Sequence, residues 1–319
     1  MSVGNRKRRM RRGLSGADVF WVLVVIALLI AILLPSLMRA RHLAKRAVCA
    51  ANLRCICQSM HIYANDNEEW FPHHYYREPK VPSANERDVA VRWEGTMGSN
   101  EFLKITEQTT PQKSPDRSHP SRSLFMLVVG GNNAPSAFLC PGSRDVEDSL
   151  RNLEDGREVA CMPGVNRFDF RGYDRLSYGY QLPYGKRAKP RNGMDPRMAL
   201  SADKGPYYTS GGEALPGSGT VRDARSDVMP PEDWGEDAIR RELDAWRPYN
   251  SRNHNGEGQN VLFADCHVEF VKRPIVGVNY DNIYTLQTDL TPAGSWAGLV
   301  PAADRPVGPL TNTDNFIVP

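Results

Sequence analysis

Residues 19–34 have the sequence VFWVLVVIALLIAILL, and the rest of the chain is organised around this apolar run. This apolar run is unbroken and ends at Pro35, a residue that can kink such a helix without ending it. A membrane-spanning helix needs roughly twenty apolar residues. The run reaches that length when residues 36–38 are counted beyond the proline. The sequence therefore predicts one lipid-compatible helix near the N-terminus.

A basic cluster precedes this run, as it would in a secretory signal peptide. The cluster consists of Arg6, Lys7, Arg8, Arg9, Arg11 and Arg12. A signal peptide would continue into a cleavage site of small residues, whereas residues 35–41 read PSLMRAR. We therefore expect the segment to be kept as a membrane anchor.

Basic residues flank the run on both sides, because Arg39, Arg41, Lys45 and Arg46 follow it. The N-terminal cluster is denser and contains no acidic residue before Asp18. The positive-inside rule then favours a single-pass protein whose N-terminus is cytoplasmic. The rest of the chain would lie outside the cytoplasm, where disulfides persist.

Beyond Pro35 the pattern changes from uniformly apolar to amphipathic, which predicts that the helix continues over residues 39–64. Small or apolar residues recur every three or four positions, at Leu37, Ala40, Ala44, Ala47, Ala51, Cys55, Ser59 and Ile62. The turn formers and proline of NDNEEWFP, residues 65–72, should end the helix. This second half is expected to rest on a soluble domain.

The remaining residues, 65–319, are expected to form one elaborate extracytoplasmic domain. The formal net charge is only +3, and the basic cluster before the apolar run accounts for it, which argues against a nucleic-acid-binding surface. The 24 prolines and 26 glycines indicate many loops. The acidic residues at 65–72 lack the glycine and distal glutamate of an EF-hand, which favours a solvated turn.

The domain pattern predicts an α+β fold, with the long helix packed on an antiparallel sheet that carries long irregular insertions. Helices are expected at residues 100–106, 121–130 and 234–246, and strands at 137–140, 176–181 and 198–202. The composition of residues 207–231 indicates a loop, and the tail beyond Pro274 is expected to wrap the surface.

The clearest local signal of the soluble part is a hairpin within residues 252–273. Two β-prone runs, 260–264 and 267–272, are separated only by Asp265 and Cys266, which predicts a two-residue turn. Such a turn prefers positive φ and therefore glycine. Cysteine at this place is either strained or forces a different turn.

The six cysteines are Cys49, Cys55, Cys57, Cys140, Cys161 and Cys266. They form no paired CxxC pattern of the zinc-binding kind. Cys55 and Cys57 are two positions apart on the predicted helix, so they point in different directions. We expect a disulfide between Cys49 and Cys140, with buried free thiols as the alternative.

Residues 11–56, RRGLSGADVFWVLVVIALLIAILLPSLMRARHLAKRAVCAANLRCI, resemble the prepilin-type N-terminal segment of type IV pilins and type II secretion pseudopilins. In that family a peptidase cuts after the glycine that ends a basic leader, the new terminal residue is N-methylated, and a glutamate follows at position five. The resemblance implies that residues 1–13 are a leader ending at Gly13, that Leu14 is the mature N-terminus, and that Asp18 takes the place of the glutamate. Residues 14–38 would then be the transmembrane and assembly helix.

Downstream strings are similar to one branch of large proteins in that family, with a C-terminal histidine, about nine residues, and Asp-Gly. Here His254, ten residues and Asp265-Cys266 fill that place, inside GQNVLFADCHVEF. VCAANLR, YANDN, FLCPGS and YDNIYT also resemble this branch. The chain departs from the family at Asp18, at Gly16-Ala17, where a bulky apolar pair is usual, and at Cys266, which replaces the turn glycine.

The acid at position 18 also has a physical reading. A charged side chain within the bilayer costs on the order of 2.5–3.5 kcal/mol, so an unpaired carboxylate there should be rare. The free amino group created at Leu14 of a neighbouring subunit would be a suitable partner for Asp18. The alternative is that Asp18 only marks the interfacial end of an ordinary anchor.

The resemblance implies a pilin-like fold and a pseudopilin-like structural subunit of the bacterial inner membrane, with a periplasmic C-terminal domain. It would assemble through its N-terminal helix into a filament of the type II secretion or type IV pilus kind. Its partners would be the prepilin peptidase, other pseudopilin subunits and the membrane, but no nucleic acid. The chain has no nucleophile elbow, phosphate-binding glycine loop or HExxH motif, so no enzyme activity or catalytic residue is expected.

The alternative function is a membrane-anchored extracytoplasmic binding or metal-binding domain outside a filament. His254, Asp265 and His267 are weak candidates for metal ligands. Adjacent Cys266 and His267 would point to opposite sides of a strand, and no third distant ligand is evident. We therefore expect no cofactor, with a structural divalent cation as the exception, and a His254 side chain bonded to backbone near residues 256–259. Tyrosines are concentrated in residues 173–184 and at Tyr207 and Tyr208. They would either form a ligand-binding surface or pack in the core.

Overall fold

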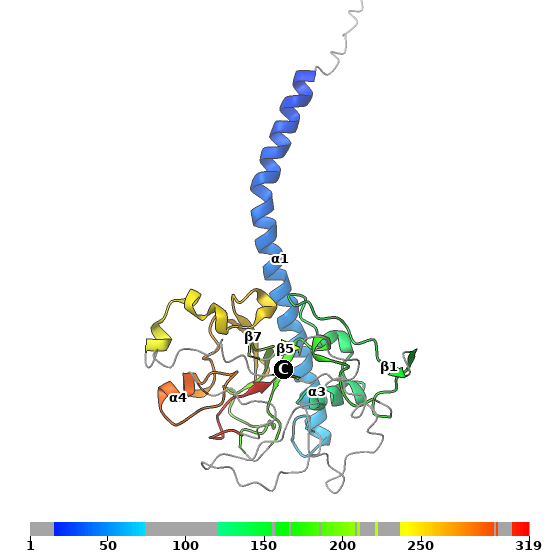
Figure 1. The fold of residues 1–319 in the computed structure, drawn as a ribbon, viewed down its shortest axis with the longest axis vertical. Coiled ribbons are helices and arrows are strands. Elements are labelled where there is room, and N and C mark those ends of the chain that lie inside the picture. Colours follow the sequence, from blue (N-terminus) through cyan, green and yellow to red (C-terminus); the bar gives the residue numbers. More distant parts are fainter. Residues whose placement is uncertain are drawn as a thin grey trace, which may run out of the picture. The chain divides into compact units, whose positions relative to one another are not determined.

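The computed structural model describes residues 16–73, 120–154, 157–165, 167–184, 187–207, 209–210, 221–222, 237–296, 298 and 308–318. The expected helix at residues 100–106 and most of the expected loop at 207–231 lie outside the described residues. Figure 1 shows the two main parts of the architecture, a long N-terminal helix and a strand-containing domain. The predicted α+β class is confirmed.

The N-terminal helix, α1, is continuous over Gly16–Asp66 and contains Pro35. A proline in a helix lacks the N–H that would bond to the carbonyl four residues earlier, here that of Ala31. The predicted end at Ala64 is correct to within two residues. The chain divides into two compact units, Met1–Ala44 and Lys45–Pro319, so α1 contributes residues to both.

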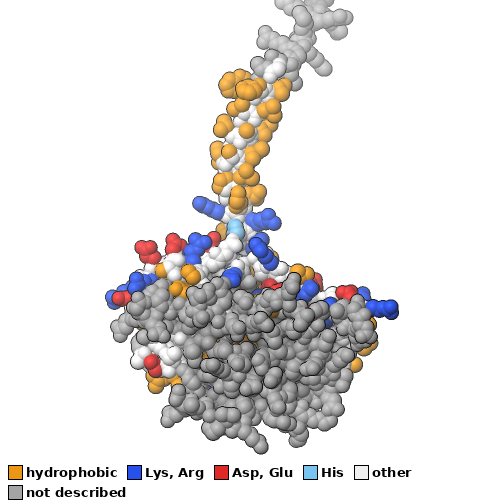
Figure 2. Space-filling model, viewed as in Figure 1, with side chains coloured by type: hydrophobic (Ala, Val, Ile, Leu, Met, Phe, Trp, Pro, Cys, Tyr) orange, Lys and Arg blue, Asp and Glu red, His pale blue; other side chains and the backbone are white. Residues whose placement is uncertain are grey.

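In the first unit the apolar side chains of α1 are exposed on every side. Apart from Val24, which is half-buried, the large hydrophobic residues from Val19 to Met38 are between 45 and 73% exposed, and Figure 2 shows apolar side chains along the visible face of this part of the helix. Among the described residues, α1 is the one helix long and apolar enough to cross a membrane. The predicted single membrane anchor is consistent with this helix.

In the second unit α1 buries one face against the domain. The fully buried residues are Cys49, Leu53, Ile56, Cys57, Met60 and Ala64, which are three or four positions apart except for the adjacent pair Ile56 and Cys57. The amphipathic helix was predicted correctly but its face was wrong, because Ala47, Ala51, Cys55 and Ile62 are exposed. Leucine, isoleucine and methionine bury more apolar area than alanine, so they decide which face packs inward.

The domain is built on a five-stranded antiparallel sheet of order β8-β7-β4-β3-β9. Its strands are β3 (Tyr178–Gln181), β4 (Ala199–Asp203), β7 (Gln259–Phe263), β8 (Val268–Val271) and β9 (Ile317–Val318). The strands predicted at 176–181 and 198–202 and the hairpin are therefore confirmed. β3, β4 and β7 are buried along their whole length, although they include polar residues such as Gln181, Asp203 and Asn260.

The described part of the tail beyond Pro274, residues 275–296, 298 and 308–318, completes the core and does not wrap the surface as expected. Its last strand, β9, pairs with β3 at the sheet edge, and Ile283, Tyr284 and Leu286 are buried. Polar residues hold this segment in place: the Asn315 side chain donates to Gln181 Oε1 at 3.2 Å and to the Ala199 carbonyl at 3.0 Å. Composition indicated a loop because these buried amides look polar in the sequence.

The remaining elements are short and lie around the sheet and α1. They are α3 (Pro120–Val129), η1 (Pro135–Phe138), β1 (Arg151–Glu154), β2 (Arg157–Ala160), η2 (Tyr173–Arg175), β5 (Thr209–Ser210), β6 (Val221–Arg222), η5 (Leu243–Tyr249), η6 (Arg252–His254), η7 (Val278–Tyr280) and α4 (Pro292–Trp296).

Among these elements α3 matches the helix expected at 121–130. The strand expected at 137–140 is wrong, because Pro135 starts a 3-10 turn there. The expected helix at 234–246 is replaced, in its described part, by 3-10 turns.

Candidate functional site

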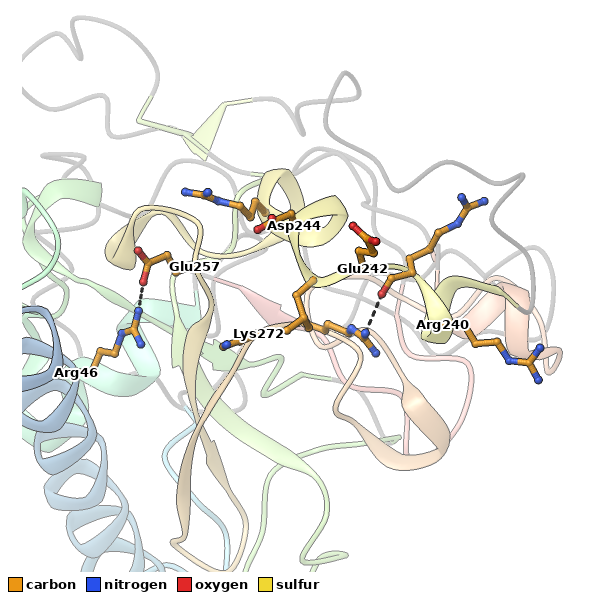
Figure 3. Close-up of a pocket in the computed structure, with 10 residues that line it drawn as sticks. Arg46, Arg240, Glu242, Asp244, Glu257 and Lys272 are labelled. Atoms are coloured by element: carbon orange, nitrogen blue, oxygen red, sulfur yellow. Dashed lines mark hydrogen bonds and ion pairs between the residues drawn. The ribbon is translucent and has the colours of Figure 1, made fainter. Parts of the chain in front are cut away.

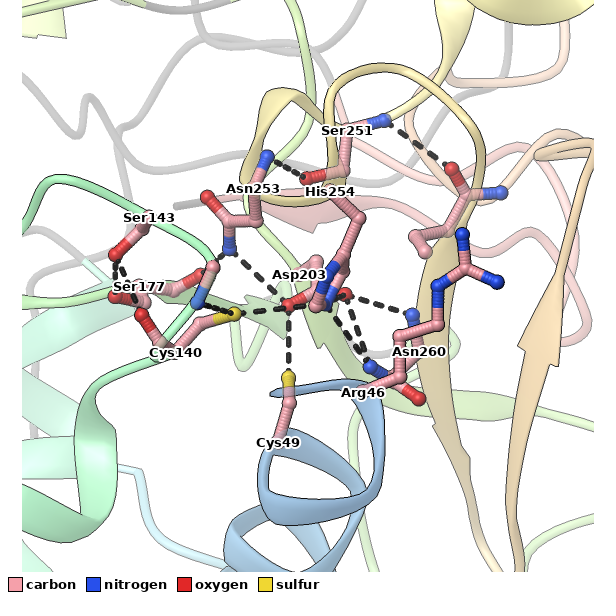
Figure 4. A network of polar contacts seen from close by, with 12 residues as sticks. Arg46, Cys49, Cys140, Ser143, Ser177, Asp203, Ser251, Asn253, His254 and Asn260 are labelled. Carbon is pink, nitrogen blue, oxygen red and sulfur yellow. Dashed lines mark hydrogen bonds and ion pairs between the residues drawn. The ribbon is translucent and has the colours of Figure 1, made fainter. Parts of the chain in front are cut away.

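Four side chains that can bind a metal converge in the interior of the domain (Figure 4), and we call them the four-ligand cluster. They are Cys49 on α1, Cys140 in the loop after η1, Asp203 at the end of β4, and His254 at the end of η6. Their ligand atoms all lie within 4.8 Å of one another. All four residues are at most 5% exposed.

The contacts inside the cluster centre on the carboxylate of Asp203. The Cys49 thiol donates to Asp203 Oδ1 at 3.1 Å, and His254 Nε2 lies 3.3 Å from Asp203 Oδ2. Cys140 Sγ lies 3.5 Å from the same nitrogen, His254 Nε2. Two thiols, an imidazole and a carboxylate therefore face one another directly.

Amide groups hold Asp203 from outside the cluster. Asn253 Nδ2 donates to Asp203 Oδ1 at 3.1 Å, and the Asn260 backbone N–H donates to Oδ2 at 2.7 Å. Asn260 Nδ2 also lies 3.2 Å from His254 Nε2. This shell fixes the position of the carboxylate and of the imidazole.

The loop that carries Cys140 approaches His254 closely, and Gly142 makes this possible. A Cβ at position 142 would lie 2.4 Å from the Asn253 carbonyl oxygen and 2.9 Å from His254 Nδ1, so only glycine fits without a shift. The Gly142 backbone N–H donates to Cys140 Sγ at 3.3 Å, a bond that stabilises negative charge on the sulfur.

Both partners of the Cys140 and His254 contact have shifted pKa values. The hydrogen bond with Cys49 and, to a smaller extent, the contact with His254 outweigh the opposing effect of burial and lower the pKa of Cys140 to about 7. Burial alone would lower the pKa of His254, but the hydrogen bonds with Asp203 and Cys140 outweigh it and raise that pKa to about 9. The pocket favours a thiolate beside a positive neighbour.

A nucleophilic Cys-His-Asp triad needs the thiol and the acid on different ring nitrogens, so that one orients the histidine while the other nitrogen takes the proton. Here Cys140 Sγ and Asp203 Oδ2 both face Nε2 of His254. The four groups instead point toward one shared centre, which is the arrangement of metal ligands.

The expected disulfide between Cys49 and Cys140 is not formed, and both residues are free thiols. The disulfide joins Cys57 on α1 to Cys266 in the hairpin. The prediction did bring together two cysteines that are close in space, but α1 directs Cys57 toward the hairpin and Cys49 toward Asp203. Spacing along the sequence could not distinguish these partners.

The hairpin turn differs from the prediction, because its connection has three residues, Ala264, Asp265 and Cys266. The Phe263 N–H donates to the His267 carbonyl at 3.0 Å, and the Cys266 N–H donates to the Phe263 carbonyl at 3.0 Å. Cys266 has φ 67°, the left-handed conformation that glycine adopts in such a loop. Cysteine therefore occupies the glycine position without changing its conformation.

The three weak metal candidates from the sequence do not form one site. His254 belongs to the four-ligand cluster, whereas Asp265 and His267 are exposed and pair with each other at 2.5 Å. His254 bonds to side chains of the cluster and not chiefly to backbone near residues 256–259, as had been expected. The second group with metal-binding atoms, Cys57, His61 and Cys266, contains the disulfide.

Sequence reasoning missed Asp203, Asn253 and Asn260. The available signal for Asp203 was an acid at the end of an apolar strand, in MALSAD. VCAANLR and FLCPGS, two strings that carried the family resemblance, contain Cys49 and Cys140. The cysteines of these two strings therefore lie in the same cluster as His254, the histidine of the C-terminal motif.

Other predicted functional residues lie elsewhere. Gly13 and Leu14 are outside the described residues, and Asp18 is part of α1 but its side chain is not described. Tyr178, Tyr180, Tyr184 and Tyr207 are fully buried, so they belong to the core and not to a ligand surface. Tyr208 is also outside the described residues.

A basic pocket of about 670 Å³ lies on the domain beside Arg46 (Figure 3). It is lined by Arg46, Arg240, Arg241, Glu242, Leu243, Asp244, Arg247, Glu257, Lys272 and Arg273. Arg46 pairs with Glu257, and Arg273 donates to the backbone carbonyls of Ile239 and Arg241. These two arginines therefore help to hold the domain together.

Comparisons with protein-family models, with curated proteins and with solved structures find no match to this chain.

Proposed function

We propose that this protein is a pseudopilin-like structural subunit, anchored in the bacterial inner membrane. It assembles through α1 into a filament of the type II secretion or type IV pilus kind, and its domain faces the periplasm. The observation that carries the proposal is that α1 is a single helix with two surfaces. Its first half exposes apolar side chains on every side, and its second half buries one face in the domain.

The two surfaces support an assembly role because they are stable in different environments. Apolar side chains exposed all round are stable only in lipid or against other apolar helices. The membrane provides lipid before assembly, and a packed filament of such helices provides apolar neighbours after it. The buried face of residues 49–64 meanwhile keeps the domain attached to the helix.

In this proposal the prepilin peptidase cuts after Gly13, and the new amino group at Leu14 meets the Asp18 carboxylate of a neighbouring subunit. The pairing would offset part of the cost of about 2.5–3.5 kcal/mol for a charge at this depth. The N-terminal basic cluster supports a cytoplasmic leader.

Mass spectrometry of the protein expressed with an active prepilin peptidase tests the processing step. We expect a mature N-terminus at Leu14 carrying one added methyl group, and no cleavage in Gly13→Leu. Gly16→Ala is the matched control, because it changes a glycine outside the cleavage site and should be cut normally. An intact leader on the unmodified chain would refute the proposal.

Crosslinking tests the assembly step separately. Single cysteines introduced at position 15 of one copy and position 19 of another, which leave Leu14 and Asp18 in place, should crosslink in membranes that contain the peptidase. The expected pairing is weakened in Asp18→Asn and kept in Asp18→Glu, because only the second keeps the charge. Processing without any crosslinked oligomer would leave the second candidate, a membrane-anchored metal-binding domain outside a filament, which the four-ligand cluster favours.

A further inference from the structure

We propose that the four-ligand cluster binds a structural Zn²⁺ ion that ties α1 to the sheet of the domain. This inference goes beyond filament assembly, because the site would be present in the subunit whether or not it is assembled. Of the three weak metal candidates from the sequence, only His254 belongs to this site, and its other ligands were not proposed as metal ligands from the sequence.

The donor set matches zinc. Zn²⁺ binds thiolate sulfur, imidazole nitrogen and carboxylate oxygen, and its structural sites have four protein ligands. Hard cations such as Ca²⁺ and Mg²⁺ select oxygen ligands only. Two sulfurs, one nitrogen and one oxygen therefore favour zinc over both.

The spacing also matches. Zinc ligands stand about 2.0–2.3 Å from the ion, so neighbouring corners of the tetrahedron are separated by about 3.3–3.8 Å. The separations are 3.1 Å from Cys49 Sγ to Asp203 Oδ1, 3.5 Å from Cys140 Sγ to His254 Nε2, and 3.3 Å from His254 Nε2 to Asp203 Oδ2. The other pairs of ligand atoms lie within 4.8 Å of one another, so shifts of up to about 1 Å would complete the tetrahedron.

The surrounding groups support charged ligands. Asn253 and Asn260 donate to the Asp203 carboxylate, and the Gly142 N–H donates to Cys140 Sγ. Metal ligands in proteins are held by hydrogen bonds of this kind, which fix their direction and basicity. Two thiolates and one carboxylate leave a single net negative charge around Zn²⁺, and these donors face that charge.

Zinc binding is an acid–base exchange and not a redox step. The two thiols each lose a proton to solvent as two Zn–S bonds form, and a protonated His254 would release a third. No electron is transferred. The chelate would connect α1, the loop after η1, β4 and η6, which are far apart in the sequence.

A disulfide between Cys49 and Cys140 is the competing state, and the contacts disfavour it. The Cys49 thiol is a hydrogen-bond donor to Asp203 Oδ1. A disulfide sulfur has no proton to donate, so the buried carboxylate oxygen would face sulfur lone pairs instead. Zinc removes the same repulsion by placing a cation between the two groups.

The first experiment uses the full-length protein, purified in detergent without chelators. Inductively coupled plasma mass spectrometry should find a single equivalent of zinc per chain. Alkylation followed by peptide mapping should find Cys49 and Cys140 protected until a chelator is added. Cys55 is an exposed free thiol and serves as the internal control, because it should react throughout.

Variants then test which residues hold the ion. Cys140→Ser and Asp203→Asn should lose the zinc, whereas Cys161→Ser, a free cysteine outside the cluster, should keep it. Asn253→Ala keeps all four ligands, so it tests the site even if a ligand variant fails to fold. Its zinc affinity, measured by competition with a chelator, should fall by about 10–100-fold.

Three results would each overturn the proposal. The first is a protein purified without zinc and with a Cys49 to Cys140 disulfide in its peptide map. The second is zinc retained at full occupancy in Cys140→Ser. The third is zinc lost when Cys57→Ala is combined with Cys266→Gly, which would assign the ion to the other cysteine and histidine group.

Discussion

The carboxyl group of Asp169 is a buried acid outside the four-ligand cluster. It is 1% exposed, and its Oδ1 accepts hydrogen bonds from Ser121 Oγ at 2.9 Å and from the Phe170 N–H at 2.8 Å. Burial raises the pKa of Asp169 to about 7, although these bonds and the charge of Arg122 oppose the shift. Burial therefore outweighs hydrogen bonding at this residue.

This shift predicts how stability depends on pH. The folded state holds the Asp169 proton up to about pH 7, whereas the unfolded state releases it near pH 3.9. The folded state binds more protons between these values, so the free energy of unfolding should fall as pH rises from about 4 to 7. Asp169→Asn should flatten that slope, measured by urea unfolding at several pH values.

A matched control is Asp195→Asn. Asp195 is paired with Arg197, whose hydrogen bonds lower the pKa of this carboxyl to about 2. Its contribution to stability is present above about pH 3.9 and is lost as pH falls toward 2, outside the window of Asp169. An identical slope between pH 4 and 7 in Asp169→Asn and the unmodified protein would contradict the interpretation.

At the scale of elements, a disulfide connects the hairpin to α1. Cys266 provides the bond to Cys57 while its backbone takes the left-handed conformation with φ 67°. That conformation destabilises a residue with a Cβ by about 1–2 kcal/mol, whereas glycine adopts it without this cost. The position therefore combines a strained backbone with a covalent link.

The two effects can be separated in a Cys57→Ala background, where no disulfide forms. There Cys266→Gly should be more stable than Cys266→Ala by about 1 kcal/mol, because glycine accepts the positive φ. Urea unfolding of both double variants measures the difference.

The same Gly and Ala pair at Asp265 is the control, since Asp265 is not among the residues with positive φ. Both substitutions there lose the pairing with His267 equally, so glycine should have no advantage. Equal stabilities of the Gly and Ala variants at 266 would show that the turn changes shape without the disulfide.

At the scale of the whole molecule, the exposed apolar half of α1 should decide where the protein resides. Val25→Arg combined with Leu29→Arg places two charges in the apolar band, each costing about 2.5–3.5 kcal/mol in a bilayer. We expect the double variant to leave the membrane fraction after alkaline extraction, while the unmodified chain stays in it.

Ile62→Arg is the matched control, because Ile62 is 53% exposed and lies on the part of α1 that belongs to the domain unit. It adds a charge to the same helix outside the apolar band, so fractionation should not change. A double variant that remained in the membrane would mean that another part of the chain anchors it.

Local patterns in the sequence determined much of the architecture. The length and uniform hydropathy of residues 19–34 predicted the exposed half of α1, and short β-prone runs predicted β3, β4 and the hairpin, because both signals depend only on neighbouring residues. The burial of the tail was not predicted. Asn315 and Gln181 are polar residues, and their burial depends on the hydrogen bond between their side chains, which the sequence does not reveal.

Local sequence patterns were sufficient to predict a lipid-compatible helix that continues into an α+β domain. Three further features follow from long-range packing: the face of α1 that is buried, the disulfide between Cys57 and Cys266, and the hydrogen bond between Cys49 and Asp203. Helical periodicity is a local property and can be read along the chain. The partner of a cysteine depends on how segments more than 150 residues apart pack together, and the separations here are 209 residues for the disulfide and 154 for the thiol and carboxylate.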